Sequence, residues 1–543
     1  MEGRTTLRPQ TVDVMRSTGV YRWSPADTQP LPEQGDAASF TPPPSYLSGY
    51  TFELWVRRHI WQFSYEAMQP PLFYALAAPV WAAADRLAGP FDAVFAVRVL
   101  NALLLALLVP LALVMAWRLT PSADVPIAAA AVLVGMPGLA LNGSQITNDT
   151  LAAVLGAATV LASLELAAKP RARWALIAGA LLGATLLTKL TAAGVAAALG
   201  LALLWPLLAR SGGFWRQVKL AALAAGAATV LLAPWLVLNL RAYGHLVPSA
   251  EAARLMGAAT SGASYTFAQS LNYAFTTFWT GEHENTVPLT GLMALACIPF
   301  TIAGLVGVQR LLRSRGRTLA ALPPLAIMLT AVVAETAWAL AVPRLSGVGG
   351  MTPGRYLYPI AVPAAVLICA GVFALLKPEL TRLAVAGVVL LGVLNLALYA
   401  EGFTAWYQEP RTDPLASDVS RDVNLDGAYQ GVDIYVDRLL VDRDEGTIWF
   451  HLIVTNTRSD GADWWSEPLI TFPNGRHVWA AYAASTPFPE TLEPHSQYAG
   501  WVKVRAIQRP EAGQHLRLLF DDIAVNGYRE VGQLQFDLVV PKD

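Results

Sequence analysis

Ten long apolar runs in the middle of the chain decide what it can fold into. They lie at about 94–118, 125–141, 147–168, 174–189, 191–209, 218–240, 287–309, 319–342, 356–376 and 380–401. A helix that crosses a bilayer needs about 20 mainly apolar residues, and helices satisfy their own backbone hydrogen bonds in lipid. We therefore predict a polytopic, all-α membrane domain over residues 94–401, with about ten transmembrane helices.

Charged residues are scarce in these runs and frequent after them. Only 14% of the 543 residues are charged, against roughly 25% in a soluble domain, which excludes a wholly soluble protein. Residues 94–401 contain nine carboxylates, whereas residues 402–543 contain 21 carboxylates and 12 Lys or Arg. We expect a linker at 402–429 and a water-exposed domain at 430–543. Nucleic acid is not expected as a partner, because no basic patch lies outside the loops between the apolar runs.

The C-terminal region has the pattern of an antiparallel β-sandwich. Six short runs are rich in β-branched and aromatic residues, and Asp, Gly and Pro clusters separate them. These runs are Val432–Asp442, Thr447–Thr455, His477–Ala484, Tyr498–Ile507, His515–Asp521 and Gln533–Val540. Its tryptophans either form a sugar-stacking surface or belong to the core and edges of the sandwich, and the second use is the more common. They are Trp449, Trp464, Trp465, Trp479 and Trp501.

Lys and Arg are distributed unevenly between the two sets of loops. Thirteen lie on one side of the ten predicted helices and six on the other. The richer side is expected to be cytoplasmic, in the plasma (inner) membrane, because cytoplasmic loops carry an excess of Lys and Arg. The N-terminal segment 1–93 and the C-terminal domain are then extracytoplasmic. Residues 70–88 are apolar but short for a span, since Pro70-Pro71 and Asp85-Arg86 bound them.

Polar residues next to the apolar runs gather on the predicted outer side. Ionisable groups at a membrane face are costly unless they are paired or functional. A transporter would distribute such groups through the midplane, so a single layer favours an active site at the outer interface. The layer consists of Glu66, Gln69, Asn142, Asn148, Asp149, Lys189, Asn239, Arg241, Glu282, His283, Glu284, Arg344 and Arg355.

Several short motifs occur in an order that is similar to a known family. The stretch Glu66–Tyr74 (EAMQPPLFY) resembles the "hQPPLYY" element of the GT-C superfamily, multipass glycosyltransferases that take sugars from polyprenyl-phosphate donors. The whole set most resembles the bacterial branch distantly related to protein mannosyltransferases and aminoarabinose transferases. In that family the Pro-Pro-Leu segment belongs to a juxtamembrane helix. The other motifs are Asn148-Asp149, Leu187-Thr188-Lys189, Pro234-Trp235, Phe278-Trp279-Thr280-Gly281 and Gly354-Arg355-Tyr356.

The resemblance implies inverting transfer of a hexose or pentose from a polyprenyl-phosphate-linked donor to an extracytoplasmic glycan, lipid or protein. Such a reaction needs a carboxylate to accept the proton of the acceptor hydroxyl. It also needs positive charge, a metal or hydrogen-bond donors at the departing phosphate. Arg355 is the first candidate for the phosphate because its guanidinium is a rigid fork of donors. The residues expected to bind substrate are Gln69, Lys189, Arg241, Glu335, Arg355 and Tyr356.

The general base is the point at which this chain departs from the family. In members of that family an acidic pair follows the first transmembrane helix, and we expect this chain to lack that helix. Asp149, Glu66 and Glu282 are the candidate substitutes, although Asp149 also has the position of a helix cap. Glu282, His283 and Glu284 are candidate ligands for a divalent metal ion. A solvated turn is the alternative, since neighbours in an extended strand point to opposite faces.

Glu335 is an intramembrane carboxylate in the outer half of its predicted helix. Such residues are functional candidates because a carboxylate in lipid is costly. The alternative function is a transporter or flippase of lipid-linked sugars, or a catalytically inactive scaffold. The missing acidic pair favours that alternative. The lack of an internal repeat and of matched broken helices opposes the transporter.

Overall fold

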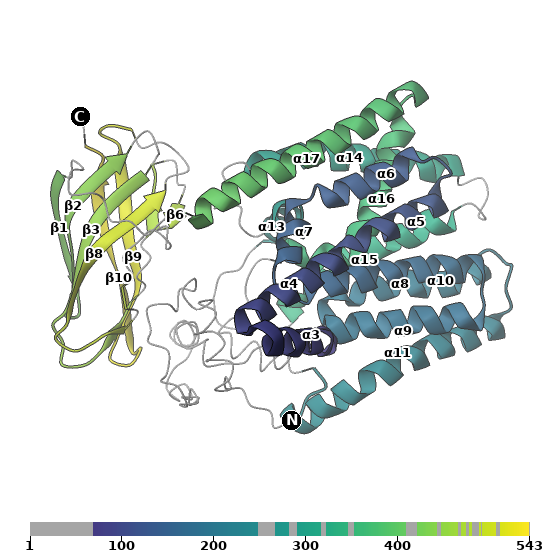
Figure 1. Ribbon diagram of the computed structural model, residues 1–543, viewed down its shortest axis with the longest axis horizontal. Helices are drawn as coiled ribbons and strands as arrows, with labels where there is room; N and C mark the ends of the chain where they lie inside the picture. Colours follow the sequence, from purple (N-terminus) through teal and green to yellow (C-terminus); the bar gives the residue numbers. More distant parts are fainter. Residues whose placement is uncertain are drawn as a thin grey trace. The chain divides into compact units, whose positions relative to one another are not determined.

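The computed structural model describes residues 69–541 except for 248–265, 282–289, 316–321, 346–351, 409–420, 443–446, 465–468, 474–476, 480–487, 490 and 506–510. The described residues form a helical unit, which ends near Phe403, and a β-sheet unit that follows it. Figure 1 shows the helices packed side by side and the strands in layers. A helical membrane domain and a C-terminal β-domain are thereby confirmed.

In the described residues, each of the ten apolar runs overlaps one or more helices. The helices are α3 (Leu72–Ala88), α4 (Pro90–Ala106), α5 (Leu108–Leu119), α6 (Asp124–Val134), α7 (Pro137–Ser144), α8 (Asp149–Ala168), α9 (Ala172–Thr188), α10 (Ala196–Leu208), α11 (Phe214–Tyr243), α13 (Phe267–Thr280), α14 (Thr290–Arg315), α15 (Pro323–Leu345), α16 (Ala361–Leu375) and α17 (Pro378–Gln408). Among the described residues, the 3-10 helix η5 (Leu190–Val195) lies between α9 and α10, and η7 (Gly354–Ile360) directly precedes α16.

Among the described residues, seven helical segments are long and apolar enough to cross a membrane. An eighth is added if α6 and α7, bent by 56° relative to each other, form one span. The prediction of about ten also counted the runs that form α9, which has 17 residues, and α14. Helix α3 also has 17 residues, in agreement with residues 70–88 being short for a span.

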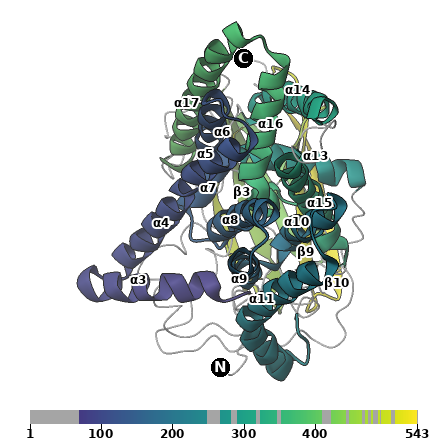
Figure 2. The ribbon, with the colours of Figure 1, turned by 90° about the vertical axis from the view of Figure 1, so that its right-hand side faces the viewer.

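Small residues allow neighbouring helices to approach closely. Gly179 and Gly183 of α9 face Ala224 and Ala228 of α11, where a Cβ atom at Gly183 would lie 2.9 Å from the Cα atom of Ala228. In lipid the hydrophobic effect does not drive helices together. Van der Waals contacts between closely packed helices stabilise their association instead. Helix α8 lies deep in the bundle and contacts α9, α10, α15 and η7 (Figure 2).

The β-unit is built from β1 (Arg421–Tyr429), β2 (Val432–Asp442), β3 (Thr447–Asn456), β4 (Ala462–Asp463), β5 (Leu469–Thr471), β6 (His477–Trp479), β7 (Thr491–Leu492), β8 (Gln497–Arg505), β9 (His515–Val525) and β10 (Glu530–Val539). One sheet has the order β1-β2-β3-β8 and the other β6-β5-β9-β4-β7, with β10 also paired to β9. A shared apolar core joins the two sheets, as expected for a sandwich. Strand β1 lies within 402–429, so describing that whole range as a linker was wrong.

Two tryptophans of this unit, Trp464 and Trp449, are buried. Trp464 is fully buried, stacks on Phe520 at a centroid distance of 6.2 Å and donates to the carbonyl oxygen of Pro489 at 2.7 Å. The side chain of Lys503 lies over the ring of Trp449, at 4.9 Å from its centroid. Core and edge packing therefore describes Trp464 and Trp449 better than an open sugar-stacking surface.

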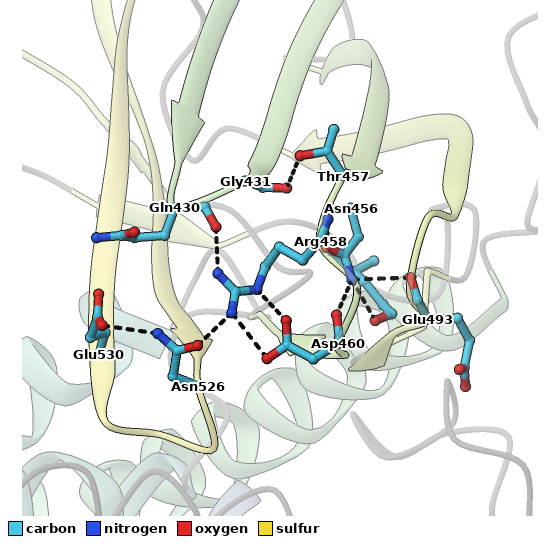
Figure 3. A network of polar contacts seen from close by, with 10 residues as sticks. Gln430, Gly431, Asn456, Thr457, Arg458, Asp460, Glu493, Asn526 and Glu530 are labelled. Atoms are coloured by element: carbon cyan, nitrogen blue, oxygen red, sulfur yellow. Dashed lines mark hydrogen bonds and ion pairs between the residues drawn. The ribbon is translucent and has the colours of Figure 1, made fainter.

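Arg458 joins three turns at one end of the sandwich (Figure 3). Its Nε and Nη2 atoms donate to the two carboxylate oxygens of Asp460 at 2.8 and 3.0 Å. Nη1 donates to the carbonyl oxygen of Gln430 at 2.8 Å, and Nη2 also contacts the side chain of Asn526. Because the guanidinium is planar with fixed donors, one side chain orders several loops here.

Candidate functional site

Asp149 lies at the first residue of α8 and is buried, with 4% of its side chain exposed. Thr147, two residues earlier, donates from its Oγ1 atom to Oδ2 of Asp149 at 2.8 Å and accepts from the Asp149 amide at 3.2 Å. A carboxylate in the first helical turn also interacts favourably with the helix dipole. The side chain is thus held in one orientation, with its other oxygen directed at Lys189.

Lys189 lies at a break between two helices. Helix α9 ends at Thr188, Lys189 has extended backbone, and η5 begins at Leu190. The Lys189 Nζ atom forms an ion pair with Oδ1 of Asp149 and lies over the ring of Tyr356, 4.8 Å from the ring centroid. A short 3-10 stretch between α-helices is common at functional hinges. This break brings a cation to the beginning of α8.

Arg355 and Tyr356 reach the same place from η7. The Arg355 Nε atom lies 4.0 Å from Oδ2 of Asp149, and 40% of the Arg355 side chain is exposed. The turn that carries it depends on Gly354, whose amide donates to Oγ1 of Thr277 at 2.7 Å. A Cβ atom at Gly354 would collide with the backbone of Thr277 and Phe278. Glycine therefore allows η7 to lie directly on α13.

Hydrogen bonds from buried asparagines fix the frame around this cluster. Asn148 donates to the carbonyl oxygen of Thr188 at 3.2 Å and so ties the beginning of α8 to the end of α9. Asn101 donates to the carbonyl oxygen of Thr147 at 3.1 Å. These bonds place Asp149 and Lys189 on a rigid support.

Glu335 completes the group from α15. Its side chain is fully buried and lies against η5, the segment that follows Lys189. Lys189 is close enough to interact with it electrostatically. The cluster Asp149, Lys189, Glu335, Arg355 and Tyr356, called the polar cluster below, therefore contains two acidic and two basic side chains.

The remaining predicted site residues do not join the polar cluster among the described residues. Gln69 is partly buried before α3, and Arg241 is exposed in the last turn of α11. Glu66 and the metal candidates Glu282, His283 and Glu284 lie outside the described residues. Within the described ranges, no group of three or more His, Cys, Asp or Glu side chains is placed to bind a metal ion.

Two residues of this site were missing from the sequence-based prediction. Thr147 orients Asp149 by a hydrogen bond. A threonine two residues before an acid at the beginning of a helix is the sequence signal that could have identified Thr147. Trp338, one turn after Glu335, donates from Nε1 to the carbonyl oxygen of Leu190 at 3.3 Å. That contact joins two distant helices, so no local pattern predicts it.

Part of the chain matches a known protein family. Residues 83–247 match the protein family described as dolichyl-phosphate-mannose-protein mannosyltransferase. This range contains Asp149, Lys189 and Arg241 and confirms the resemblance to polyprenyl-phosphate-sugar-dependent GT-C glycosyltransferases. No curated protein matches the chain.

Two solved structures are similar to the chain, both of ArnT from Cupriavidus metallidurans. The structure bound to undecaprenyl phosphate has 16% sequence identity and a TM-score of 0.41, and the apo structure has 16% and 0.38. Each match covers 75% of this chain and 66% of the ArnT chain. The chain thus matches slightly less than two thirds of the length of that protein.

Proposed function

We propose that this chain is a membrane glycosyltransferase that moves a sugar from a polyprenyl-phosphate-linked donor to an acceptor at the outer face of the plasma membrane. The observation that carries the proposal is the buried contact of Asp149 with Lys189, with Arg355 beside it. Asp149 and Lys189 lie within the range that matches the mannosyltransferase family. The acceptor is a hydroxyl group of a glycan, lipid or protein, and the sugar is a hexose or a pentose.

The proposed reaction exchanges one bond at the anomeric carbon for another. The acceptor oxygen attacks that carbon from the face opposite the phosphate, the bond from carbon to phosphate oxygen breaks, and the configuration inverts. The polyprenyl phosphate leaves with the bonding electrons, and the hydroxyl proton passes to a carboxylate. We favour Asp149 as the base because, among the described acids, it is the one paired with Lys189 and Arg355. Glu66 and Glu282 remain candidates.

The cations would stabilise the phosphate as negative charge develops on it. Arg355 is the more exposed of the two and offers a fork of donors, so we assign it to the donor phosphate, with Lys189 beside it. Tyr356 lies against Lys189 and would limit its movement. Gln69 and Arg241 are proposed to contact more distant parts of the substrates. Glu282, His283 and Glu284 remain candidate ligands for a divalent ion.

The test is transfer of label from a radiolabelled undecaprenyl-phosphate sugar to an acceptor in membranes that contain the protein. We expect transfer by the wild type and at least tenfold less by Arg355→Ala, since loss of one charge-stabilising donor costs about 10²–10³ in rate. Arg313→Ala, at an exposed arginine of α14, is the matched control and should retain activity. Movement of intact lipid-linked sugar across the bilayer without transfer would support the transporter instead.

A further inference from the structure

Helices α9 and α11 begin next to each other, at the end of the helical unit that lies away from the polar cluster. Their two glycine–alanine contacts advance in the same direction along both helices, so α9 and α11 run parallel. At their beginnings, Nη2 of Arg216 donates to the carbonyl oxygen of Pro170, just before α9. Helix α9 has 17 residues. Its beginning therefore lies about 25 Å from Lys189, at a rise of about 1.5 Å per residue.

Exposed cations gather where these two helices begin. They are Arg171, Arg173, Arg216 and Lys219. Neither helix has an acid in its first turn, and the sequence contains no Asp or Glu from 166 to 250. Glu165, the preceding acid, forms ion pairs with Arg118 and Lys169. Because the beginning of a helix carries a partial positive charge, cations there are unfavourable and a bound anion would be stabilising.

Two side chains at this end carry buried hydrogen-bond donors that have no partner among the described residues. Gln217, near the beginning of α11, is 4% exposed, and neither polar atom of its side-chain amide has a hydrogen bond. Gln217 lies on the same face as Leu220 and Ala224, the face that packs against α9. The Nε1 atom of Trp174, in the first turn of α9, is also buried and unpartnered. Buried donors of this kind are costly, so the space between the two helix beginnings suits a ligand with acceptor oxygens.

Aromatic residues place this end at the level of lipid headgroups. Phe214 and Trp215 begin α11 and are 60% and 74% exposed. Exposed aromatic residues at the end of an apolar helix are typical of the membrane–water interface. Residues 214–241 are apolar enough to cross a membrane, and little of that segment is buried among the described helices. The anion closest to this end would therefore be the phosphate of a membrane lipid.

We propose that the beginnings of α9 and α11 bind the phosphate group of an anionic phospholipid, whose acyl chains lie along the exposed apolar side of α11. Arg171 and Arg216 contact the phosphate from the two helices, and Gln217 donates from the base of the site. The site is separate from the polar cluster, and the inference does not depend on the proposed sugar transfer. It lies on the side that the distribution of Lys and Arg predicts to be cytoplasmic.

Membrane orientation alone is the competing explanation for the cations, since loops on the cytoplasmic side are rich in Lys and Arg. Orientation depends on the number of charges. It requires neither the contact of Arg216 with Pro170 nor an unpartnered amide between the helices. Gln217→Leu separates the two explanations, because it removes the amide but keeps every charge. Removal of an unpartnered amide should also leave the lipid-free chain at least as stable as the wild type.

The measurement is the affinity of the full chain in detergent for phosphatidylglycerol, by native mass spectrometry, with phosphatidylcholine as the zwitterionic comparison. We expect phosphatidylglycerol to bind at least about tenfold more tightly than phosphatidylcholine. Arg171→Ala/Arg216→Ala should weaken phosphatidylglycerol binding by at least about tenfold, and Gln217→Leu by roughly three- to tenfold. Arg310→Ala/Arg313→Ala removes two exposed arginines of α14. This matched control should stay within about twofold of the wild type.

Equal affinity for the two phospholipids, equal effects of the two double variants, or wild-type affinity in Gln217→Leu would each overturn the site. Full competition by free glycerol phosphate would also overturn it, because binding would then not need a lipid. If Arg171→Ala/Arg216→Ala does not fold, Gln217→Leu decides alone. A lower unfolding temperature of lipid-free Gln217→Leu would show that the protein itself holds the amide, and would overturn the place of Gln217 in the site.

Discussion

Asp149 and Lys189 form a buried ion pair across 40 residues of sequence, from the first turn of α8 to the break after α9. Removal of one partner from such a pair leaves an uncompensated charge, which costs more than removal of both. We expect Lys189→Met to lose about 3–5 kcal/mol of stability. The double variant Asp149→Asn/Lys189→Met should recover part of that loss. Thermal unfolding of the purified chain in detergent measures the stability of the single and the double variant. If the double variant were no more stable than Lys189→Met, the ion pair would not be the cause of the loss.

Arg355 should act on the donor through the geometry of its guanidinium. Lysine keeps the charge but lacks the fork of donors, so Arg355→Lys is expected to retain only part of the activity. We expect kcat to fall roughly tenfold in Arg355→Lys, with a smaller change in KM for the lipid-linked donor, because the lost donors act on charge that develops in the transition state. Steady-state kinetics over a range of donor concentrations provide the measurement. A lysine variant with wild-type kinetics would show that charge alone is sufficient.

Gly354 should not tolerate alanine. An added Cβ would collide with the backbone of Thr277 and Phe278, which forces η7 and Arg355 away from α13. We expect Gly354→Ala to reduce transfer by at least tenfold, since small displacements of positioning groups have effects of roughly 10²-fold. Gly387→Ala is a matched control, because a Cβ there meets nothing within 4 Å. Equal activity of the two variants would contradict the packing argument.

Arg458 should stabilise the β-unit locally. Arg458→Ala removes four hydrogen bonds, three of them to charged or carbonyl partners at 2.8–3.0 Å. We expect a loss of roughly 1–3 kcal/mol, detected as faster hydrogen exchange in the turns around Gln430, Asp460 and Asn526. Arg517→Ala, at an exposed arginine of β9, is the comparison and should leave exchange in those turns unchanged.

Asp522 should make the β-unit less stable as the pH rises. Burial raises the pKa of Asp522 to about 6, whereas an unfolded aspartate titrates near about 3.9. The folded state binds the proton more tightly, so its stability falls as the pH rises through that interval and stays lower above it. Asp522→Asn removes the effect and suits the positive φ of 59° at this position.

We therefore expect Asp522→Asn to exchange amide hydrogens in β9 and β10 more slowly than the wild type above pH 6, compared at equal pH. The difference should shrink as the pH approaches 4. A constant difference across the range would mean that the ionisation of Asp522 is not its cause.

The architecture could be predicted from local patterns, and the site only in part. The ten apolar runs predicted helices because a segment that crosses lipid must be long and apolar. In the C-terminal region, strand β2 has the predicted bounds Val432–Asp442. Strand β1 was missed because its residues are largely exposed and include Asn424 at a positive φ of 49°. The polar layer included Asp149, Lys189 and Arg355, which the structure brings together. Which of them touch depends on how α8, α9 and η7 pack, and that is not encoded in any single segment.

The most direct test of the account is whether sugar transfer and release of the lipid phosphate occur together. Purified protein in liposomes would receive an undecaprenyl-phosphate sugar and an acceptor, and mass spectrometry would count glycosylated acceptor and free undecaprenyl phosphate. The account predicts equal amounts of the two products from the wild type and neither from Asp149→Asn. Full product formation by Asp149→Asn, or an intact donor that only changes leaflet, would contradict it.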